Sequence, residues 1–359
     1  MPGVLTRLVS AFAIKFAQYY YSSLAGLYIL WRWFRTGGGA LRLKQREMPR
    51  KLIDNYNHKY ILLPSGVNMH YVEAAITGDP TAPLMVMVHG YPEFWYSWRF
   101  QIEHFKDRYR VVAIDQRGYG DSSKPPNITD YSITLLAKDV DDLIHGLDGS
   151  SLWVCLLKLL FTGYDNAVVL GHDWGGAVTW KLALHYPQSV HRLIMCNCPH
   201  PAAFSSLLSK NKAQQSNSWY MLFFQTPRIP EAAVSADDFL MFEKAFWGKY
   251  GLTNKENFTV EDMEAWKCTF SKPDCLRSAI NYYRCSYQHP DKGKIKEKCV
   301  VKTLILWGDN DKFLLKEGAT MSKEWCDDAT LHFIPGASHW VQQDEPKLVN
   351  EHIDNFLQS

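Results

Sequence analysis

Apolar positions after about residue 55 fall into short continuous runs, separated by stretches with helical spacing. Runs such as LMVMVH at 84–89 and TLILWG at 303–308 are apolar at nearly every position, which is typical of strands in a parallel sheet covered on both faces. Helical patterns, for example at 134–147 and 177–186, lie between such runs. The predicted strands are 60–63, 68–74, 84–89, 110–114, 167–171, 192–196, 303–307 and 331–334. The alternation predicts an α/β fold with a mostly parallel, doubly wound sheet.

Residues from about 200 to 295 interrupt this alternation. They combine aromatic and charged stretches at helical spacing with few strand-like runs. We interpret them as a helical cap inserted between two strands of the sheet. The predicted organisation is therefore an N-terminal segment at 1–51 and one α/β domain at 52–359 that carries the cap.

The N-terminal segment has its own hydropathy pattern. The run from Ala11 to Phe34 is largely apolar, and its 16 residues from Phe16 to Trp31 carry no charge, against about 20 residues needed to span a bilayer. Lys15 and Arg32 could extend the span by reaching opposite interfaces. We predict a single-pass membrane anchor of the signal-anchor type, with a cleaved signal peptide or a buried core helix as alternatives.

The charges that flank this segment predict its orientation. Basic side chains are concentrated after it, in the sequence up to Lys51, with Arg7 before it. The positive-inside rule then places the α/β domain in the cytoplasm, and the expected membrane is the endoplasmic reticulum. The eight cysteines show no CxxC pair and no zinc-type spacing, so we expect reduced thiols and no metal.

Composition excludes some partners. The formal net charge is only +2, and 21% of residues are charged against 47% hydrophobic, so nothing favours a nucleic acid. The 13 Trp, 19 Tyr and 18 Phe suit either a bulky apolar pocket or an aromatic core.

The first candidate for chemistry is Asp173. It lies in Gly171-His-Asp173-Trp-Gly175-Gly, directly after a predicted strand and before a predicted helix. This is the context of a nucleophile elbow, in which small residues permit a sharp turn that exposes the nucleophile. If Asp173 were only a helix cap, the flanking glycines would have no explanation.

Two further candidates follow the last two predicted strands. His339 lies in GASHW after the final strand, and Asp311 lies in WGDND after the one before it. The order nucleophile, acid, histidine is the order of the α/β-hydrolase triad. Asp309 lies on the same loop and is the alternative to Asp311 as the acid.

Several motifs together carry a resemblance to a known family. The segments HGYPE at 89–93, DQRGYGDS at 115–122, GHDWGG at 171–176 and NYYR at 281–284 resemble those of epoxide hydrolases. The resemblance extends from about residue 52 to the C-terminus, and it is strongest to the membrane-anchored, mammalian-type enzymes. It implies the α/β-hydrolase fold with its inserted cap.

The resemblance also implies roles for cap residues. Tyr283 and Tyr220 match the two tyrosines that hold the epoxide oxygen, and Tyr282 is the alternative within its pair. The backbone N–H groups of Tyr91 and Trp174 are expected to form an oxyanion hole.

The expected reaction converts a lipophilic epoxide, with fatty-acid epoxides as one candidate class, to a vicinal diol. Asp173 attacks a ring carbon to form an ester, and His339, oriented by Asp311, then activates the water that hydrolyses it. No cofactor or metal enters this scheme.

Two other readings stay open at this point. A haloalkane dehalogenase also uses an Asp nucleophile, with Trp174 as a halide donor, and a non-catalytic protein could bind a lipid or a partner. The largely apolar insertion from Gly149 to Gly163 leaves the last reading open, because it is either a surface helix or a gene-model artefact.

Overall fold

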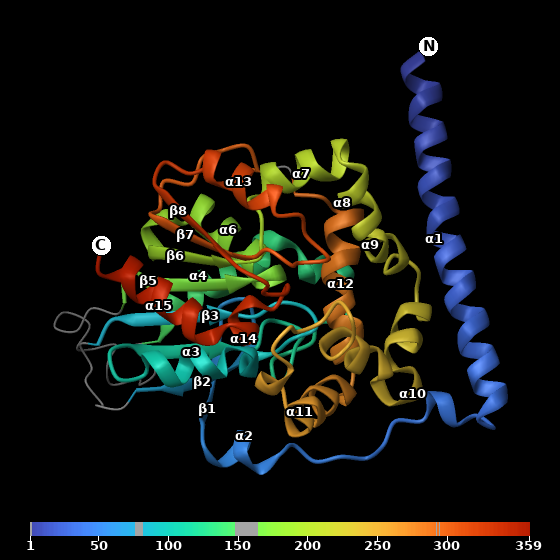
Figure 1. The fold of residues 1–359 in the computed structure, drawn as a ribbon, viewed down its shortest axis with the longest axis horizontal. Coiled ribbons are helices and arrows are strands. Elements are labelled where there is room, and N and C mark those ends of the chain that lie inside the picture. Colours follow the sequence, from blue (N-terminus) through green and yellow to red (C-terminus); the bar gives the residue numbers. More distant parts are fainter. Residues whose placement is uncertain (1, 76–81, 148–163, 292, 294) are drawn as a thin grey trace.

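An eight-stranded sheet forms the centre of the molecule in a computed structural model that describes residues 2–75, 82–147, 164–291, 293 and 295–359, with side chains from residue 14 onward (Figure 1). The strands are β1 (Asn57–Leu62), β2 (Asn68–Ala74), β3 (Leu84–Val88), β4 (Arg110–Ile114), β5 (Ala167–His172), β6 (Val190–Cys196), β7 (Thr303–Gly308) and β8 (Ala329–Ile334). All eight lie at the predicted positions, within three residues at each end.

The strand order is β1-β2-β4-β3-β5-β6-β7-β8. Strands β3 to β8 pair in parallel, whereas β1 and β2 pair antiparallel. Every residue of β3, β5 and β7 is buried, as expected for parallel strands with helices on both faces. The predicted α/β fold with a mostly parallel sheet is confirmed.

Helices flank the sheet. Helix α3 (Arg99–Phe105) packs against α15 (Pro346–Leu357), and α4 (Ile133–Gly146) packs against α6 (Asp173–His185). The other elements of the α/β domain are α2 (Arg50–Asp54), α13 (Glu317–Glu324), α14 (Val341–Asp344) and the 3-10 turns η2 (Trp95–Trp98), η3 (Ile128–Tyr131) and η4 (Pro187–Ser189).

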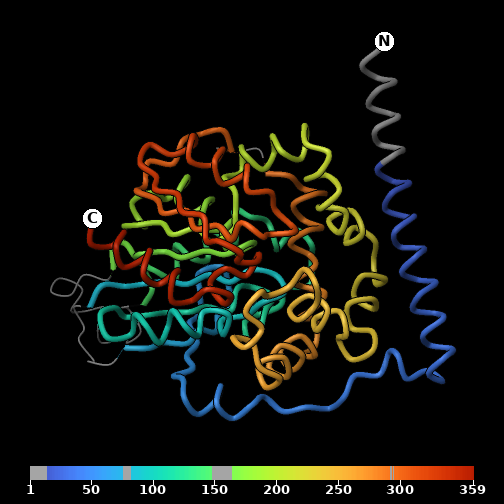
Figure 2. Tube along the Cα trace, in the orientation of Figure 1, coloured from blue at the N-terminus to red at the C-terminus, as the bar shows by residue number. Residues whose placement is uncertain are grey.

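A helical cap lies between β6 and β7 in the sequence and covers one end of the sheet (Figure 2). Its helices are α7 (Pro201–Lys210), α8 (Lys212–Asn217), α9 (Trp219–Phe223), α10 (Ile229–Phe246), α11 (Val260–Ser271) and α12 (Cys275–Gln288), with the 3-10 turn η5 (Lys255–Asn257). The position of these helices means that the cap meets the sheet where the parallel strands end.

The N-terminal segment forms one long helix, α1 (Pro2–Arg35), which ends in the turn η1 (Gly39–Leu41). Figure 1 shows α1 beside the cap, and it packs against α9 and α10. The buried Ser22 hydroxyl lies 2.8 Å from Thr226 Oγ1, and Arg32 makes a bidentate pair with Asp237 at 2.8 Å. One side of α1 is therefore bound to protein.

The prediction of a membrane-spanning anchor is not supported. Within the described part of the chain, no helix combines the length and the apolar character that crossing a bilayer requires. The physical reason lies in the polar positions of α1, such as Gln18, Ser22 and Arg32, which the cap contacts or which are buried. The location at the endoplasmic reticulum and the division into 1–51 and 52–359 stay predictions.

Two ion pairs connect the N-terminal segment to a kink in α10. Residues Asp237, Asp238 and Phe239 all have positive φ, which is costly for residues with a side chain. The kink presents Asp237 to Arg32 and Asp238 to Arg46, whose Nη2 atom lies 2.7 Å from Asp238 Oδ2. The segment before β1 therefore helps to hold an otherwise unfavourable turn of the cap.

The insertion from Gly149 to Gly163 lies outside the described residues, as does Cys155. The other seven cysteines have free thiols, and six of them are buried.

Candidate active site

Strand β5 ends at His172, and α6 begins at Asp173, so the turn between them sets the position of the Asp173 carboxylate. Asp173 has a φ of 48°, in the left-handed region. A Cβ atom on Gly175 would collide with the Val88 carbonyl oxygen, and one on Gly171 with Thr179. Bulk is thus excluded on both sides of Asp173, as a nucleophile elbow requires.

The predicted triad residues lie together. His339 Nδ1 lies 2.7 Å from Asp311 Oδ2, and His339 Nε2 lies 3.4 Å from Asp173 Oδ2. The other carboxylate oxygen of Asp173 accepts a hydrogen bond of 2.8 Å from the backbone N–H of Tyr91. The alternative acid, Asp309, is exposed and accepts instead from the Gly336 N–H at 2.7 Å. The geometry therefore favours Asp311.

The two predicted cap tyrosines face each other near Asp173. The ring centroids of Tyr220, on α9, and Tyr283, on α12, lie 5.8 Å apart with the planes at 83°. Within the described residues, neither phenol hydroxyl makes a hydrogen bond, so both are available to a ligand. Tyr282 is different, because its hydroxyl donates to the Arg117 carbonyl at 2.7 Å and its ring is fully buried. The structure thus separates a pocket tyrosine from a packing tyrosine in the NYYR segment.

A pocket of about 160 Å³ joins these groups. Asp173 and His339 come from the α/β domain, and the two tyrosines come from α9 and α12 of the cap. The remaining lining is apolar or aromatic: Tyr91, Pro92, Trp219, Phe223, Phe224, Met241, Phe242, Ala245, Phe313 and Trp340. Trp174, the other predicted oxyanion-hole residue, lies in the first turn of α6, and its ring meets that of Tyr283 edge-on at 5.0 Å.

Comparison with known proteins identifies the family. Residues 83–346 match the α/β hydrolase fold family. "Epoxide hydrolase 2" of Caenorhabditis elegans is 41% identical over 99% of this chain and 95% of its own length. "Epoxide hydrolase 4" of Homo sapiens is 37% identical over 94% of this chain and 89% of its own. The chain belongs to the epoxide hydrolases.

Solved structures agree with this assignment. An epoxide hydrolase from Bacillus megaterium, solved in complex with an inhibitor, has a TM-score of 0.71 and 29% identity, and the match covers 84% of this chain and 100% of that one. A putative acyltransferase from Salmonella enterica has a TM-score of 0.73 at 21% identity, which shows the fold alone. The relatives named above identify this chain as a hydrolase that acts on epoxides, and they confirm the resemblance noted in its motifs.

Charge sets the protonation states in the site of the enzyme. Burial opposes ionisation of Asp173, but the hydrogen bond and charge of His339 outweigh it and place the pKa of Asp173 below its usual range. Burial also lowers the pKa of His339, but the charges of Asp311 and Asp173 outweigh it and raise that pKa to about 10. The resting enzyme therefore holds an imidazolium between two carboxylates.

The tyrosines remain neutral. Burial, with a smaller contribution from the negative charge of Asp173, raises the pKa of Tyr220 and Tyr283 above the usual value for a phenol. Both hydroxyls therefore carry a proton at neutral pH and can donate it to an oxygen in the pocket.

The acid Asp311 has a partner that sequence analysis did not single out. Asn197 follows β6 with a φ of 42°, and its side-chain amide donates to Asp311 Oδ2 at 2.7 Å. Its carbonyl oxygen accepts from the Gly308 N–H at 2.9 Å. The only signal in the sequence was its place, as a polar residue at the carboxyl end of a buried strand.

Glu93, quoted in the HGYPE motif without a role, is the centre of a second buried network. It accepts from the Gly90 N–H at 2.8 Å and lies 2.6 Å from Nδ1 of His172. The other ring nitrogen of His172 lies 2.8 Å from the His339 carbonyl oxygen. Gln342 and Gln343 donate to the remaining oxygen of Glu93. The network joins the loops that carry Tyr91, Asp173 and His339.

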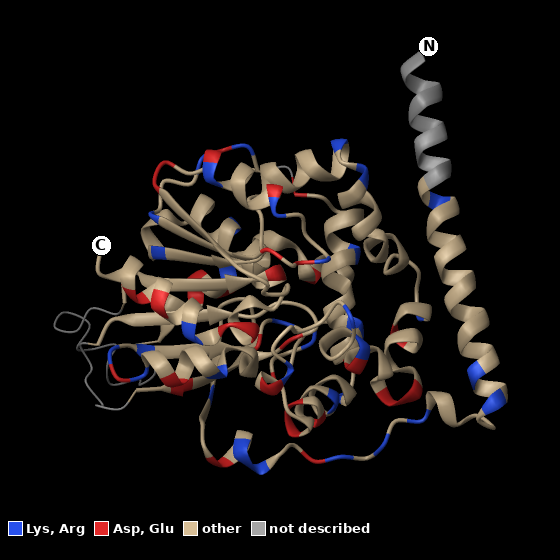
Figure 3. Cartoon of the chain, viewed as in Figure 1, with Lys and Arg blue, Asp and Glu red and all other residues tan. Residues whose placement is uncertain are grey.

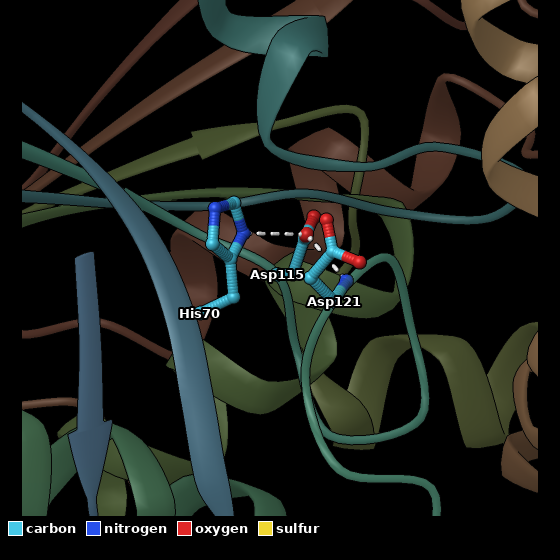
Figure 4. Close-up of side chains that lie close together, drawn as sticks. All are labelled: His70, Asp115 and Asp121. Atoms are coloured by element: carbon cyan, nitrogen blue, oxygen red, sulfur yellow. Dashed lines mark hydrogen bonds and ion pairs between the residues drawn. The ribbon is translucent and has the colours of Figure 1, made fainter. Parts of the chain in front are cut away.

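A third polar group, away from the pocket, has the composition of a metal site but is engaged in the fold. His70 Nδ1 lies 2.8 Å from Asp115 Oδ2, and Asp121 extends the group (Figure 4). The carboxylate of Asp115 also accepts the backbone N–H groups of Trp95 and Asp121, and Asp121 pairs with Lys272 at 2.6 Å. These contacts bind the DQRGYGDS turn to β2.

Proposed function

We propose that this epoxide hydrolase opens its substrate through a covalent ester on Asp173. The observation that carries the proposal is the composition of the pocket. An ionised carboxylate and two neutral phenols line the same space of about 160 Å³. A nucleophile on one side and two proton donors on the other are the two requirements for opening an epoxide.

In the first half-reaction the epoxide oxygen accepts hydrogen bonds from Tyr220 and Tyr283. Asp173 attacks a ring carbon, the carbon–oxygen bond breaks, and one phenol gives its proton to the departing oxygen. The products are an ester and a hydroxyl on the neighbouring carbon. The imidazolium of His339 then returns a proton to the tyrosinate, so that both phenols are neutral again.

In the second half-reaction His339 acts as a base. Ester formation removes the charge of Asp173, which was one of the causes of the raised pKa of His339, so this pKa falls and the imidazole, which has just lost its proton, can act as a base. It takes a proton from water, and the hydroxide adds to the ester carbonyl. The N–H of Tyr91, already 2.8 Å from Asp173 Oδ1, and that of Trp174 would stabilise the oxyanion. On collapse the bond to the alkyl oxygen breaks, this oxygen takes the proton of the hydroxyl that was added, the diol leaves, and the carboxylate of Asp173 is restored.

The proposed substrates are lipophilic epoxides, including those of fatty acids. Apart from the catalytic groups, the pocket is lined by apolar and aromatic side chains, which favour an apolar substituent next to the epoxide ring.

We further propose that α1 attaches the enzyme to a membrane surface while lying along it. The face of α1 away from the cap exposes Phe16, Tyr19, Tyr20, Leu27, Leu30, Trp31 and Phe34. Arg35 is the last residue of α1, and Arg42 and Lys44 follow the helix. An exposed apolar face with basic residues beside it is typical of interfacial helices. Binding of the full chain to sedimented vesicles containing anionic lipid, lost when Leu27 and Leu30 are both changed to Ser, would test this attachment.

The ester mechanism is tested with the full chain and a lipophilic epoxide in oxygen-18 water. With enzyme in excess, the new diol oxygen should come from Asp173 and be mostly unlabelled, whereas repeated turnover should label it. Label in the diol at the first turnover would show direct attack by water and would overturn the ester mechanism. The Asp173→Ala variant, with its folding verified by circular dichroism, is the matched control and should form no diol.

A further inference from the structure

A second apolar space, with a volume of about 320 Å³, lies between α1 and the cap. We call it the α1 groove. Its walls are Leu24, Ala25 and Tyr28 on one side and Ala233, Ala236 and Leu240 of α10 on the other. Figure 2 shows α1 running beside this part of the cap. The groove therefore exists only because α1 packs on the cap, with one wall from each element.

The α1 groove adjoins the catalytic pocket. Trp219, Phe223 and Met241 line both spaces, so these three side chains are the partition between them. Trp219 and Met241 are 40% and 37% exposed, and Tyr21 of α1 contacts Trp219 at a ring distance of 5.1 Å. An apolar chain that extends from one space into the other would have to pass between these three side chains.

The sizes of the two spaces indicate what such a chain would be. Pockets that hold ligands of drug size measure roughly 300–1,000 Å³. The catalytic pocket, at about 160 Å³, lies below that range, and the α1 groove, at about 320 Å³, brings the combined space inside it. A small epoxide fits the catalytic pocket, whereas a long substituent needs the groove.

One cation gives the α1 groove a polar end. Lys244 of α10 lines the groove and is exposed, and it has no ion-pair partner in the part of the chain that the structure describes. The other charged residue of the lining, Asp237, is already taken by Arg32. Figure 3 shows that α1 itself carries no acidic residue along its described length. The free charge of the groove is therefore positive and suits a carboxylate.

We propose that the α1 groove binds the chain of a long-chain epoxide that ends in a carboxylate, with the carboxylate at Lys244 and the epoxide at Asp173. This inference rests on the proposed function, because it adds a binding site, outside the catalytic pocket, for the chain of the substrate proposed above. It makes α1 a part of the substrate-binding site. The main source of affinity would be the removal of the apolar surface of the substrate chain from water.

The first test fills the groove. Ala233 lines the α1 groove but not the catalytic pocket. Ala233→Trp therefore places a large ring in the groove alone. It should lower kcat/KM for a long-chain epoxy acid at least about tenfold, since several methylenes lose their site. The same variant should leave kcat/KM for a small aromatic epoxide unchanged. Val260→Trp, at an exposed position of the cap that lines neither space, is the matched control and should affect neither substrate.

The second test addresses the charge. Lys244→Gln should raise KM about tenfold for the epoxy acid and leave KM for its methyl ester unchanged. Lys249→Gln, an exposed lysine of the same cap, should change neither. Equal effects of Ala233→Trp on long and small epoxides, or of Lys244→Gln on acid and ester, would overturn the inference.

A binding measurement separates this inference from the proposed mechanism. Calorimetry with a saturated fatty acid of the same chain length, which carries no epoxide, should show binding to the full chain and weaker binding to Ala233→Trp. If no epoxide is hydrolysed but this pattern appears, the mechanism fails and the groove stands. If small epoxides are hydrolysed but the fatty acid binds both proteins equally, the groove inference fails and the mechanism stands.

Discussion

The two sides of the catalytic pocket are held in place by different forces. On the sheet side, Asp173, His339 and Asp311 are linked by hydrogen bonds and opposite charges, at distances of 2.7 to 3.4 Å. On the cap side, Tyr220 and Tyr283 are held by ring contacts with each other, and Tyr283 also packs against Phe224 at 4.9 Å.

This difference matches the chemistry that each side supplies. Positions fixed by directional bonds suit a nucleophile and a base that must hold their geometry closely. Positions fixed by packing leave the phenol hydroxyls free for the substrate oxygen. The sheet side is therefore sensitive to the loss of a single charge, and the cap side to the loss of a single hydroxyl.

The largest expected effect comes from removing the nucleophile on the sheet side. Asp173→Ala should lower kcat by at least about 10⁴-fold, because no other group replaces the attacking carboxylate. Steady-state diol formation measures the loss. Residual turnover within tenfold of the unchanged enzyme would mean that Asp173 is not the nucleophile.

The next effect separates the tyrosines of the cap side. Tyr283→Phe or Tyr220→Phe should each lower kcat about 100-fold, since one proton donor remains in either variant. Tyr282→Phe is the matched control, because it loses a 2.7 Å hydrogen bond to Arg117 and should cost about 1 kcal/mol of stability. A larger loss of kcat in Tyr282→Phe than in Tyr283→Phe would reverse the assignment of the pocket tyrosine.

A third prediction concerns the charges of the sheet side. The pKa of His339 is raised to about 10 by Asp311 and Asp173 against the effect of burial. In Asp173→Ala it should fall, which imitates the loss of charge on ester formation, and titration of the His339 ring by NMR measures the change. Because the folded-state pKa lies above the unfolded one, this site contributes stability below about pH 6.5, and the contribution disappears as the pH rises through 10. An unchanged pKa of His339 in Asp173→Ala would contradict the proposed change of His339 from acid to base.

The smallest effect is expected at Asn197. Asn197→Ala removes one hydrogen bond to Asp311 but leaves those from the backbone N–H groups of Phe313 and Leu314. Because Asp311 keeps these partners, kcat should fall only about tenfold. A loss as large as that of Asp173→Ala would show that Asn197 alone positions the acid.

The sheet side was predictable from sequence, and the contacts of α1 were not. A nucleophile elbow depends on neighbours in sequence, such as Gly171 and Gly175 around Asp173, so local patterns reveal it. The role of Asn197 depends on a residue 114 positions away, which no local pattern shows. The hydropathy of α1 predicted a membrane span because the cap that covers its polar side is remote in sequence.

The strand ends show a similar limit. Strand β1 begins at Asn57, three residues before the predicted start, and β6 begins at Val190, two residues before it. The additional residues are mostly polar and pair with neighbouring strands through their backbones, as His58 does with Val72. Hydropathy detects the buried part of a strand, whereas backbone pairing continues into its exposed end.

The contacts of Arg46 with the kink of α10 have a consequence for the use of shorter chains. A chain that begins at residue 52 would keep every catalytic residue but lose the ion pairs of Arg32 with Asp237, Arg46 with Asp238 and Lys51 with Asp262. The segment up to Lys51 runs along the outside of the cap, and these ion pairs hold it there. Arg32 and Lys51 are each 30% exposed, whereas Arg46 is only 7% exposed. Added salt, which screens exposed charges most, should therefore weaken the pairs of Arg32 and Lys51 before that of Arg46.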